Sequence, residues 1–392
     1  MKASWMALLS GLLISIAGCG SAAAPAQSGG ASASPATASV SGPASGATSA
    51  SSGPSTAGSA SAAGSAPAAV AKPSGPAVTV KVGGLGGTPD RFIWVGNDKG
   101  YYVEQGINLD VTLFKSFSEM VPLLATGKLD IGAGGMSPGL FNAMLSGISM
   151  KVVSDTSLIA SPPPGHHMSY GLVVRNDLKD QVKTIADMKG RTIGVNGSEG
   201  IGQLQLDAIL HLGGLSNADV NVQPVPFPDA YAALGNKKLD GALELEPFIT
   251  LGIQQNVAFP LGDLSQATPN APAQWIFYST DFIKNQPEIG KRLLLAYTKT
   301  MRYIEDAFFK NQNRDEVVQI YMKNTQAKDP KSYDAQTPTE NEVNANVNVQ
   351  ALSYDQDYFV AHGWQKSKLD VNSVVDTSFG DYVRQTLGMY QR

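Results

Sequence analysis

The chain has 392 residues, of which 43% are hydrophobic and 16% are charged, and its formal net charge at pH 7 is −4. A pI of about 5.6 and the lack of any basic stripe argue against nucleic acid as a partner. Cys19 is the only cysteine. Once Cys19 is modified, the rest of the chain can form no disulfide, thiolate metal site or cysteine nucleophile.

The amino terminus has the pattern of an export signal. Lys2 is followed by an uncharged, mostly apolar run over residues 5–16, which is too short to span a bilayer comfortably. The run ends in Ile16-Ala17-Gly18-Cys19, which resembles the bacterial lipobox. This resemblance implies a lipoprotein signal peptide at 1–19, lipidation of Cys19, and a protein anchored by lipid on the outer or periplasmic side of the cell membrane.

The next segment is compositionally biased. Residues 20–71 are almost entirely Ala, Ser, Gly, Pro and Thr, and no charged residue occurs between Lys2 and Lys72. Such a segment buries too little apolar surface to offset the entropy of ordering it. We therefore expect a disordered tether at 20–77, with a root-mean-square reach of about 40 Å.

From residue 78 onward, short strands alternate with helices. Strands are expected at 78–82, 107–113, 129–133, 149–153, 171–174, 192–195 and 220–225. Helices are expected from 89 or 90 to 102 and at 119–126, 184–189, 201–211, 287–309 and 314–323. This rhythm is typical of an α/β fold with a largely parallel sheet, in which ligands bind beyond the carboxyl ends of the strands.

Two stretches of the chain are similar to each other. Leu-Ala-Thr-Gly-Lys-Leu-Asp at 124–130 and Leu-Gly-Asn-Lys-Lys-Leu-Asp at 234–240 each end an expected helix and lead into an apolar strand. Chance recurrence of a common helix-to-strand turn would explain the similarity, but so would two lobes built alike.

Four motifs, in order, carry a family resemblance. They are Gly-Tyr-Tyr-Val-Glu-Gln-Gly-Ile at 100–107, Gly-Lys-Leu-Asp-Ile-Gly at 127–132, the stretch 187–195, and Asp-Gly-Ala at 240–242 followed by Glu246-Pro247. Together they resemble the substrate-binding proteins of ABC transporters for nitrate, sulfonate and taurine, a group that includes the Thi5-like binders of pyrimidine precursors. The resemblance implies a type II periplasmic-binding-protein fold with two α/β lobes joined by a hinge.

Mapped on that plan, lobe one comprises 78–172 and 273–392, and lobe two comprises 173–272. The resemblance implies a monomer without a cofactor that carries a small-molecule ligand to an ABC permease and its ATPase. Ligand that contacts both lobes would stabilise a closed form reached by hinge bending.

Candidate ligand-binding residues lie in loops that follow strands. They are Gly134, Gly135, Met136 and Ser137 in lobe one, and Gly197, Ser198 and Glu199 in lobe two. Small residues would let a ligand approach the backbone, and free N–H groups at a helix start favour oxygen-bearing ligands. Each loop has a purely structural alternative, because Ser198 could cap a helix and 134–137 could be a tight turn.

Carboxylates and aromatic side chains complete the candidate site. Glu244 and Glu246 alternate along an expected strand and so share a face; we expect at least one to line the cleft, unless they are exposed at the strand end. The aromatic candidates are Phe117, Phe227 and Trp275, with Trp94 and Phe277 as further possibilities. Core packing is the alternative for each aromatic ring.

The charges near the expected cleft favour one ligand class. Glutamates outnumber the basic candidates Arg91 and Lys115, whereas a bare sulfonate or nitrate would require Arg or Lys. A neutral or amine-bearing heteroaromatic such as a pyrimidine is therefore favoured over these anions.

Other functions have weaker support. The nucleophile elbow of a serine hydrolase, Gly-x-Ser-x-Gly, would need a glycine at the position of Asn196. His211 and His362 could serve as its base, but neither has a supporting motif. The adjacent pair His166-His167 has no ligand-spaced carboxylate and predicts no metal site. The fungal synthases of the Thi5 group share a cysteine-rich stretch that this chain lacks. A tethered sensor of the same fold, without transport, remains the main alternative.

Overall fold

The computed structural model describes residues 75–85, 90–114, 116–159, 161–197, 199–325, 327–336 and 340–391. All of them belong to one compact unit of the chain, Gly64–Arg392. The predicted signal peptide with Cys19 and most of the predicted tether lie outside the described residues, as do Lys115 and Ser198.

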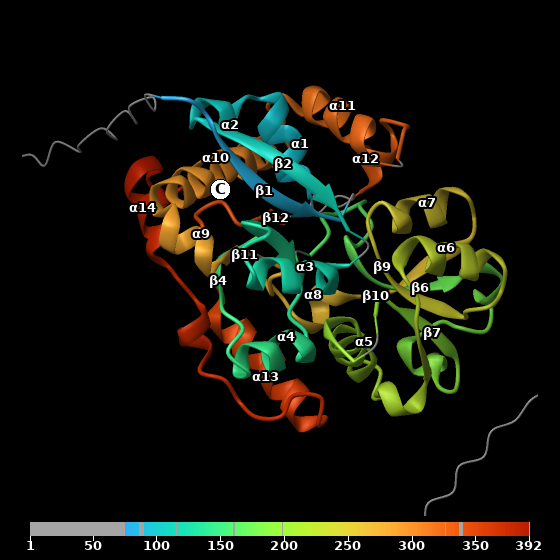
Figure 1. Ribbon diagram of the computed structural model, residues 1–392. Coiled ribbons are helices and arrows are strands. Elements are labelled where there is room, and N and C mark those ends of the chain that lie inside the picture. Colours follow the sequence, from blue (N-terminus) through green and yellow to red (C-terminus); the bar gives the residue numbers. More distant parts are fainter. Residues whose placement is uncertain are drawn as a thin grey trace, which may run out of the picture. The chain divides into compact units, whose positions relative to one another are not determined.

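The first sheet has the strand order β2-β1-β3-β11-β4 (Figure 1). Its strands are β1 (Val78–Gly84), β2 (Ile107–Leu113), β3 (Ile131–Gly134), β4 (Met150–Asp155) and β11 (Trp275–Ser279). β1 pairs in parallel with β2 and β3, whereas β11 runs antiparallel to β3 and β4. A strand from far along the chain therefore completes the sheet formed by the first four.

The second sheet repeats this arrangement with the order β8-β7-β9-β6-β10. Its strands are β6 (Tyr170–Arg175), β7 (Thr192–Val195), β8 (Asn221–Pro224), β9 (Gly241–Leu245) and β10 (Ala258–Asp263). β7 pairs in parallel with β8 and β9, and β6 runs antiparallel to β9 and β10. Each sheet thus has three parallel strands on one side, as predicted, followed by one reversed strand (β11 or β6) and an edge strand (β4 or β10) that is antiparallel to the reversed one.

Two stretches join the sheets, and we call them the crossing segments. Residues 156–169 lead from β4 to β6, and residues 264–274 lead from β10 back to β11. Within the first, β5 (Ser157–Leu158) pairs with β12 (Glu340–Asn341), which ties this crossing segment to the carboxyl-terminal part of the chain.

Helices cover both faces of the sheets (Figure 1). They are α1 (Arg91–Asp98), α2 (Tyr101–Glu104), α3 (Phe117–Ala125), α4 (Pro138–Leu145), α5 (Ile201–His211), α6 (Phe227–Gly235), α7 (Phe248–Gln254), α8 (Leu264–Ala267), α9 (Thr280–Asn285), α10 (Pro287–Phe309), α11 (Arg314–Asn324), α12 (Ser332–Ala335), α13 (Val349–Ala361) and α14 (Ser378–Leu387).

The first sheet separates two hydrophobic cores, as the side chains of β11 show. Ile276 and Tyr278 pack on the side of α1 and α10, whereas Trp275 and Phe277 pack on the side of α3, α4 and α13.

Most predicted elements are confirmed within a few residues, including the strands at 107–113 and 192–195 and the helices at 201–211 and 287–309. The single helix expected up to residue 102 is wrong, because Gly100 adopts φ 70° and separates α1 from α2. The segment 184–189 forms only a 3-10 helix, Ile185–Met188. α13 and α14 were not predicted.

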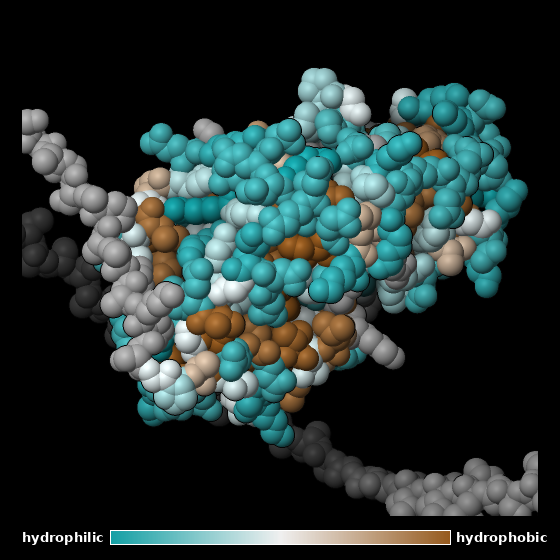
Figure 2. All heavy atoms as spheres, turned by 90° about the horizontal axis from the view of Figure 1, so that it is seen from above, coloured by the Kyte–Doolittle hydropathy of each residue, from teal (hydrophilic) through white to brown (hydrophobic). Residues whose placement is uncertain are grey.

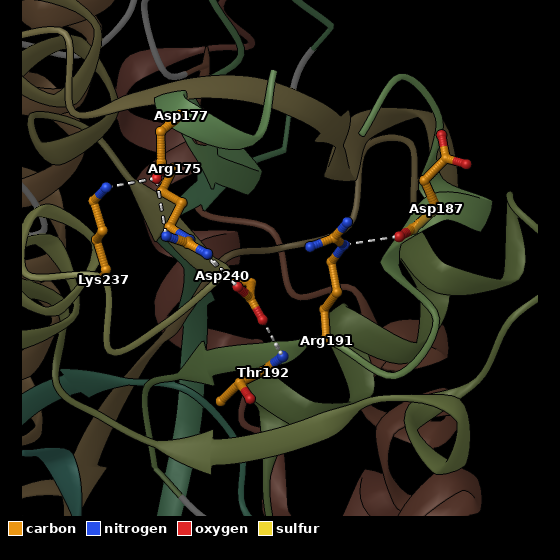
Figure 3. Close-up of polar contacts among 7 residues, drawn as sticks. All are labelled: Arg175, Asp177, Asp187, Arg191, Thr192, Lys237 and Asp240. Atoms are coloured by element: carbon orange, nitrogen blue, oxygen red, sulfur yellow. Dashed lines mark hydrogen bonds and ion pairs between the residues drawn. The ribbon is translucent and has the colours of Figure 1, made fainter. Parts of the chain in front are cut away.

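The two similar stretches of sequence make the same contact in the two sheets. Asp130 precedes β3, and its Oδ2 accepts a hydrogen bond of 2.8 Å from the backbone N–H of Lys81 in β1. Asp240 precedes β9, and its Oδ2 accepts one of 3.0 Å from the N–H of Thr192 in β7 (Figure 3). Arg175 also binds Asp240, at 3.1 Å. The repeated sequence therefore marks a repeated strand junction.

The face shown in Figure 2 is largely hydrophilic, with apolar residues in patches between the hydrophilic ones. Val103 and Leu113 are among the large hydrophobic side chains that are exposed. Among the described helices, none has the length and apolar character needed to cross a membrane.

We predict that Gly171→Ala destabilises the second sheet. A methyl group there would lie 2.2 Å from the backbone carbonyl of Gly262 in the paired strand β10, which cannot move without disturbing the pairing. The expected loss is about 1–3 kcal/mol in the free energy of unfolding, measured by urea denaturation. Gly139→Ala is the control: at this exposed helical position a methyl group would meet only Oγ of Ser137, at an ordinary van der Waals distance of 4.0 Å, so stability stays unchanged or rises. Equal stability of the two variants would contradict the prediction.

Candidate functional site

The loops that follow β3 and β7 meet in the structure. A methyl group added at Gly135 would lie 3.1 Å from Cγ2 of Ile201, the first residue of α5. Two of the loops predicted to bind ligand are therefore neighbours, although they come from different sheets. A small residue at Gly135 permits this close approach.

Side chains of the loop after β3 serve the fold. Met136 is fully buried in the core on the side of α3 and α4. The Ser137 hydroxyl accepts a hydrogen bond of 3.2 Å from the Leu140 N–H and so caps α4. A methyl group at Gly134 would lie only 2.0 Å from the ring of Phe117. Because these side chains serve the fold, a ligand bound here would contact backbone groups.

The loop after β7 has an unusual backbone. Gly197 has φ 91° and Glu199 has φ 47°, and both residues are exposed. The position that caps α5 belongs to Gly200, which has no side chain to serve as a cap. Ser198, the predicted cap, is therefore not the N-cap residue, and its side chain lies outside the described part.

Glu244 is a buried carboxyl group without a partner. Only 1% of the residue is exposed, and neither carboxylate oxygen has a hydrogen-bond partner among the described residues. Burial raises the pKa of Glu244 well above its ordinary value, and the nearby N–H of Leu245 offsets only part of that effect. Burial therefore favours the protonated form of Glu244, which can donate one hydrogen bond and accept others.

Tyr170 lies close enough to Glu244 to feel its charge, and Phe227 packs against Tyr170. Tyr170 begins β6, next to β9, and its pKa is raised first by burial and second by the charge of Glu244. Its ring meets that of Phe227 edge to face, with the centroids 6.3 Å apart. We call these three residues the Glu244 cluster. It combines a buried carboxyl group, a phenol and an apolar ring.

Glu246 has a different role from Glu244. β9 ends at Leu245, so Glu246 is not a strand residue as predicted, and it turns toward α7. It accepts hydrogen bonds from the Thr250 hydroxyl, at 2.8 Å, and the Thr250 N–H, at 3.1 Å. Burial raises its pKa to about 7, against the opposing effect of these bonds. Because both glutamates are buried, the exposed alternative is wrong.

The other aromatic candidates lie in different surroundings. Phe117 is half-buried and contacts Phe277, with ring centroids 4.8 Å apart. Trp275 is buried and lines a pocket between α5, α13 and the crossing segments. Neither Glu244 nor Phe227 is among the described residues that line this pocket. The predicted site residues are thus spread over at least two places.

Of the two basic candidates, the structure describes only Arg91. Arg91 is buried and donates from Nε to the side-chain oxygen of Asn341 at 2.9 Å. In the described part of the chain, no group of three or more His, Cys, Asp or Glu residues is arranged to hold a metal ion.

Three residues of interest were missed by sequence reasoning: Tyr170, Gln205 and Asp355. Tyr170 stands just before an expected strand, so an aromatic residue at a strand start was the available signal. Gln205 is a polar residue between Leu204 and Leu206 on an expected helix, a pattern that predicts a polar group facing a core. Asp355 gave no signal, because its helix was not predicted.

Two mixed sheets of matching strand order, joined by two crossing segments, define the fold of periplasmic binding proteins, as predicted. The family model described as NMT1/THI5 like matches residues 91–307, more than half of the chain. The chain therefore belongs to the NMT1/THI5-like family, which confirms the resemblance seen in its motifs.

Similar proteins fit this assignment. A protein of Brucella abortus (strain 2308) named as a binding protein is 27% identical over 289 residues, 70% of this chain and 83% of that protein. The riboflavin-binding protein RibY of Chloroflexus aurantiacus is 27% identical over 207 residues, 52% of this chain and 55% of that protein.

Solved structures share the fold at low identity. The nitrate-binding protein NrtA of Synechocystis PCC 6803 has a TM-score of 0.62 at 18% identity, covering 79% of this chain and 89% of that chain. The desulfurization enzyme DSZB has a TM-score of 0.56 at 17% identity, covering 78% of this chain and 98% of that chain.

We predict that Glu246 makes stability fall as pH rises from about 4.5 to about 7. Its pKa is raised from 4.5 to about 7 in the folded protein, so the folded state holds the proton more tightly than the unfolded state. The stabilisation is complete below pH 4.5 and is lost as pH rises through 7. Urea denaturation across this range checks it: Glu246→Gln should flatten the decline, and Glu199→Gln, at an exposed residue, should not. Identical pH profiles for wild type and Glu246→Gln would count against it.

Proposed function

We propose that this protein is an extracytoplasmic solute-binding protein that captures a small organic molecule and delivers it to an ABC permease and its ATPase. The Glu244 cluster carries the proposal. A buried carboxyl group without a partner costs stability, so its retention calls for a ligand that supplies the missing hydrogen bonds. Its place at the carboxyl end of a strand agrees with where this class of sheet binds ligands.

The chemistry of the cluster favours a neutral heteroaromatic ligand such as a pyrimidine. A neutral carboxyl group can donate to a ring nitrogen and accept from an amino group, while Tyr170 and Phe227 offer apolar ring surfaces. The name of the Chloroflexus relative includes a heteroaromatic ligand, which supports this class. A nitrate-like or sulfonate anion, as in the name of the Synechocystis structure, is the alternative.

Binding would close the protein around the ligand. We assign lobe one to 78–172 and 273–392 and lobe two to 173–272, with the crossing segments as the hinge. The contact between Gly135 and Ile201 supports an arrangement in which loops of both lobes approach one solute. Ligand that touches both lobes stabilises the closed form, which the permease would recognise. A tethered sensor would use the same closure without transport.

Catalysis is the second candidate, because a desulfurization enzyme has this fold. We favour binding over catalysis because the relatives that match this chain over half or more of its length are named as binding proteins.

We predict that a pyrimidine raises the melting temperature of the full chain in a panel with taurine, alkyl sulfonates, nitrate and amines. At about a hundred times its dissociation constant, a ligand adds roughly 2.7 kcal/mol to the stability of the folded state. Glu244→Gln, which keeps a neutral hydrogen-bonding group, should bind within about threefold of wild type, whereas Glu244→Ala should lose about tenfold or more.

The outcomes separate the alternatives. A sulfonate or nitrate hit that survives Glu244→Ala would show that backbone N–H groups, and not the Glu244 cluster, bind the solute. No shift with any compound would remove these substrate classes and leave the sensor as the better proposal.

We further propose that Cys19 carries the lipid anchor and that the tether holds the folded part near the membrane. Cys19→Ala should move the protein from the detergent phase to the aqueous phase in Triton X-114 partitioning, because the acyl chains would be missing. Ser10→Ala, in the same predicted signal segment, is the control and should leave partitioning unchanged. Retention of Cys19→Ala in the detergent phase would refute lipidation at this residue.

A further inference from the structure

Two helices of the carboxyl-terminal part of the chain contact helices of the second sheet. α12 lies against α7, and α13 lies against α5 (Figure 1). Ile249 of α7 and Leu206 of α5 are buried in two cores of the second sheet, whereas Tyr333 of α12 and Phe359 of α13 are buried in cores of the first. Both α12 and α13 lie beyond residue 307, where the family match ends.

The contact between α13 and α5 is centred on the hydroxyl group of Tyr358. Its oxygen accepts a hydrogen bond of 3.3 Å from Nδ2 of Asn217. Asn217 is fixed to α5, because Nδ2 also donates to the carbonyl of Gln203 and the backbone N–H donates to Oδ1 of Asp207, both at 2.7 Å. Burial raises the pKa of Tyr358, and the nearby charge of Asp207 raises it further. One phenol of α13 thus meets an amide and a carboxylate from the side of the second sheet.

Tyr358 is held firmly on the side of the first sheet. Its ring stacks on that of His362, with the centroids 4.0 Å apart, and meets the ring of Trp364 edge to face at 5.8 Å. At the start of α13, the N–H of Asn348 donates to the carboxylate of Asp155 at 2.9 Å. Asp155 is the last residue of β4, directly before the first crossing segment. α13 is therefore anchored where the chain leaves the first sheet.

Further contacts join the same two sides. Leu204 of α5 is only 3% exposed, and it packs in the core of the first sheet that also holds Leu352 of α13. Between α12 and α7, the hydroxyl of Ser332 donates a hydrogen bond of 3.3 Å to Oε1 of Gln254. Because each of these contacts joins helices that belong to different sheets, each would break if the two sheets moved apart.

We propose that two clasps, Tyr358 with Asn217 and Ser332 with Gln254, hold the two lobes together independently of solute and set how readily the protein opens to admit and release it. The proposal rests on the hinge motion proposed above, but not on the solute that the Glu244 cluster binds. A closed form that is already populated raises the apparent affinity for any solute that prefers it. Single hydrogen bonds contribute little net stability, so the clasps can break and form again.

The test measures the distance between the lobes in the full chain without solute. Spin labels at Lys128→Cys and Lys238→Cys occupy equivalent exposed positions in the two similar stretches of sequence, one beside each sheet. Cys19→Ala leaves no other thiol to label. Double electron–electron resonance then separates closed and open forms by their label distances. We expect Tyr358→Phe to raise the ratio of open to closed protein about two- to tenfold, the effect of one hydrogen bond.

Matched controls remove hydrogen bonds that lie on one side only. Tyr231→Phe loses the hydrogen bond of 2.6 Å from Tyr231 to Gln255, which joins α6 to the end of α7. Ser353→Ala loses a hydrogen bond to the Val349 carbonyl within α13. Neither bond connects the two sheets, so both variants should keep the label distances of the parent. Circular dichroism checks that every variant is folded.

Combined variants decide whether the clasps act as proposed. Asn217→Ala and Tyr358→Phe remove the same bond, so together they should open the protein no more than the stronger of the two alone, whereas Ser332→Ala should add to either. The proposal is overturned if Tyr358→Phe with Ser332→Ala gives the same distances as the parent, or if Tyr231→Phe opens the protein equally. Opening of the clasp variants supports it even where no solute of the panel binds, so failure of the proposed function is a separate result.

Discussion

The arrangement of both sheets depends on an aspartate at the start of the third parallel strand. Asp130 accepts from the Lys81 N–H and donates its own N–H to the Lys81 carbonyl, and Asp240 does the same with Thr192. These paired bonds set the register, so that Gly132 is opposite Gly83 and Ala242 is opposite Gly194. The register in turn decides which residues stand at the carboxyl ends of the strands, and so it places Gly134 and Glu244.

Buried carboxyl groups divide into those with hydrogen-bond partners and those with buried oxygens that have none among the described residues. The single N–H of Asn348 is shared between the two carboxylate oxygens of Asp155, at 2.9 and 3.1 Å, and Glu246 accepts two hydrogen bonds from Thr250. Both therefore compensate part of the cost of burial within the protein. Glu244 and Asp355 have buried oxygens without such bonds. The same residue type thus stabilises a turn in one place and is a candidate for ligand binding in another.

Much of the fold was predictable because its causes are local. Gly127 and Lys237, with φ 64° and 59°, end helices at the positions where the repeated sequence indicates a turn. The Gly100 break and the weak helix at 185–188 were not predicted, since periodicity alone does not show where a helix changes direction. α13 was missed although it supplies a wall of the pocket. Its apolar residues serve a core whose other residues are distant in sequence.

The site was less predictable than the fold, because the sequence alone does not show which buried polar groups form hydrogen bonds within the protein. Glu244 and Glu246 were equivalent candidates two residues apart, and only the end of β9 at Leu245 separates them. Glu246 lies beyond the strand and reaches Thr250 four residues later, whereas Glu244 stays within the sheet beside Tyr170. Desolvation then favours the neutral form of Glu244. The different surroundings of these two glutamates therefore follow from where one strand stops.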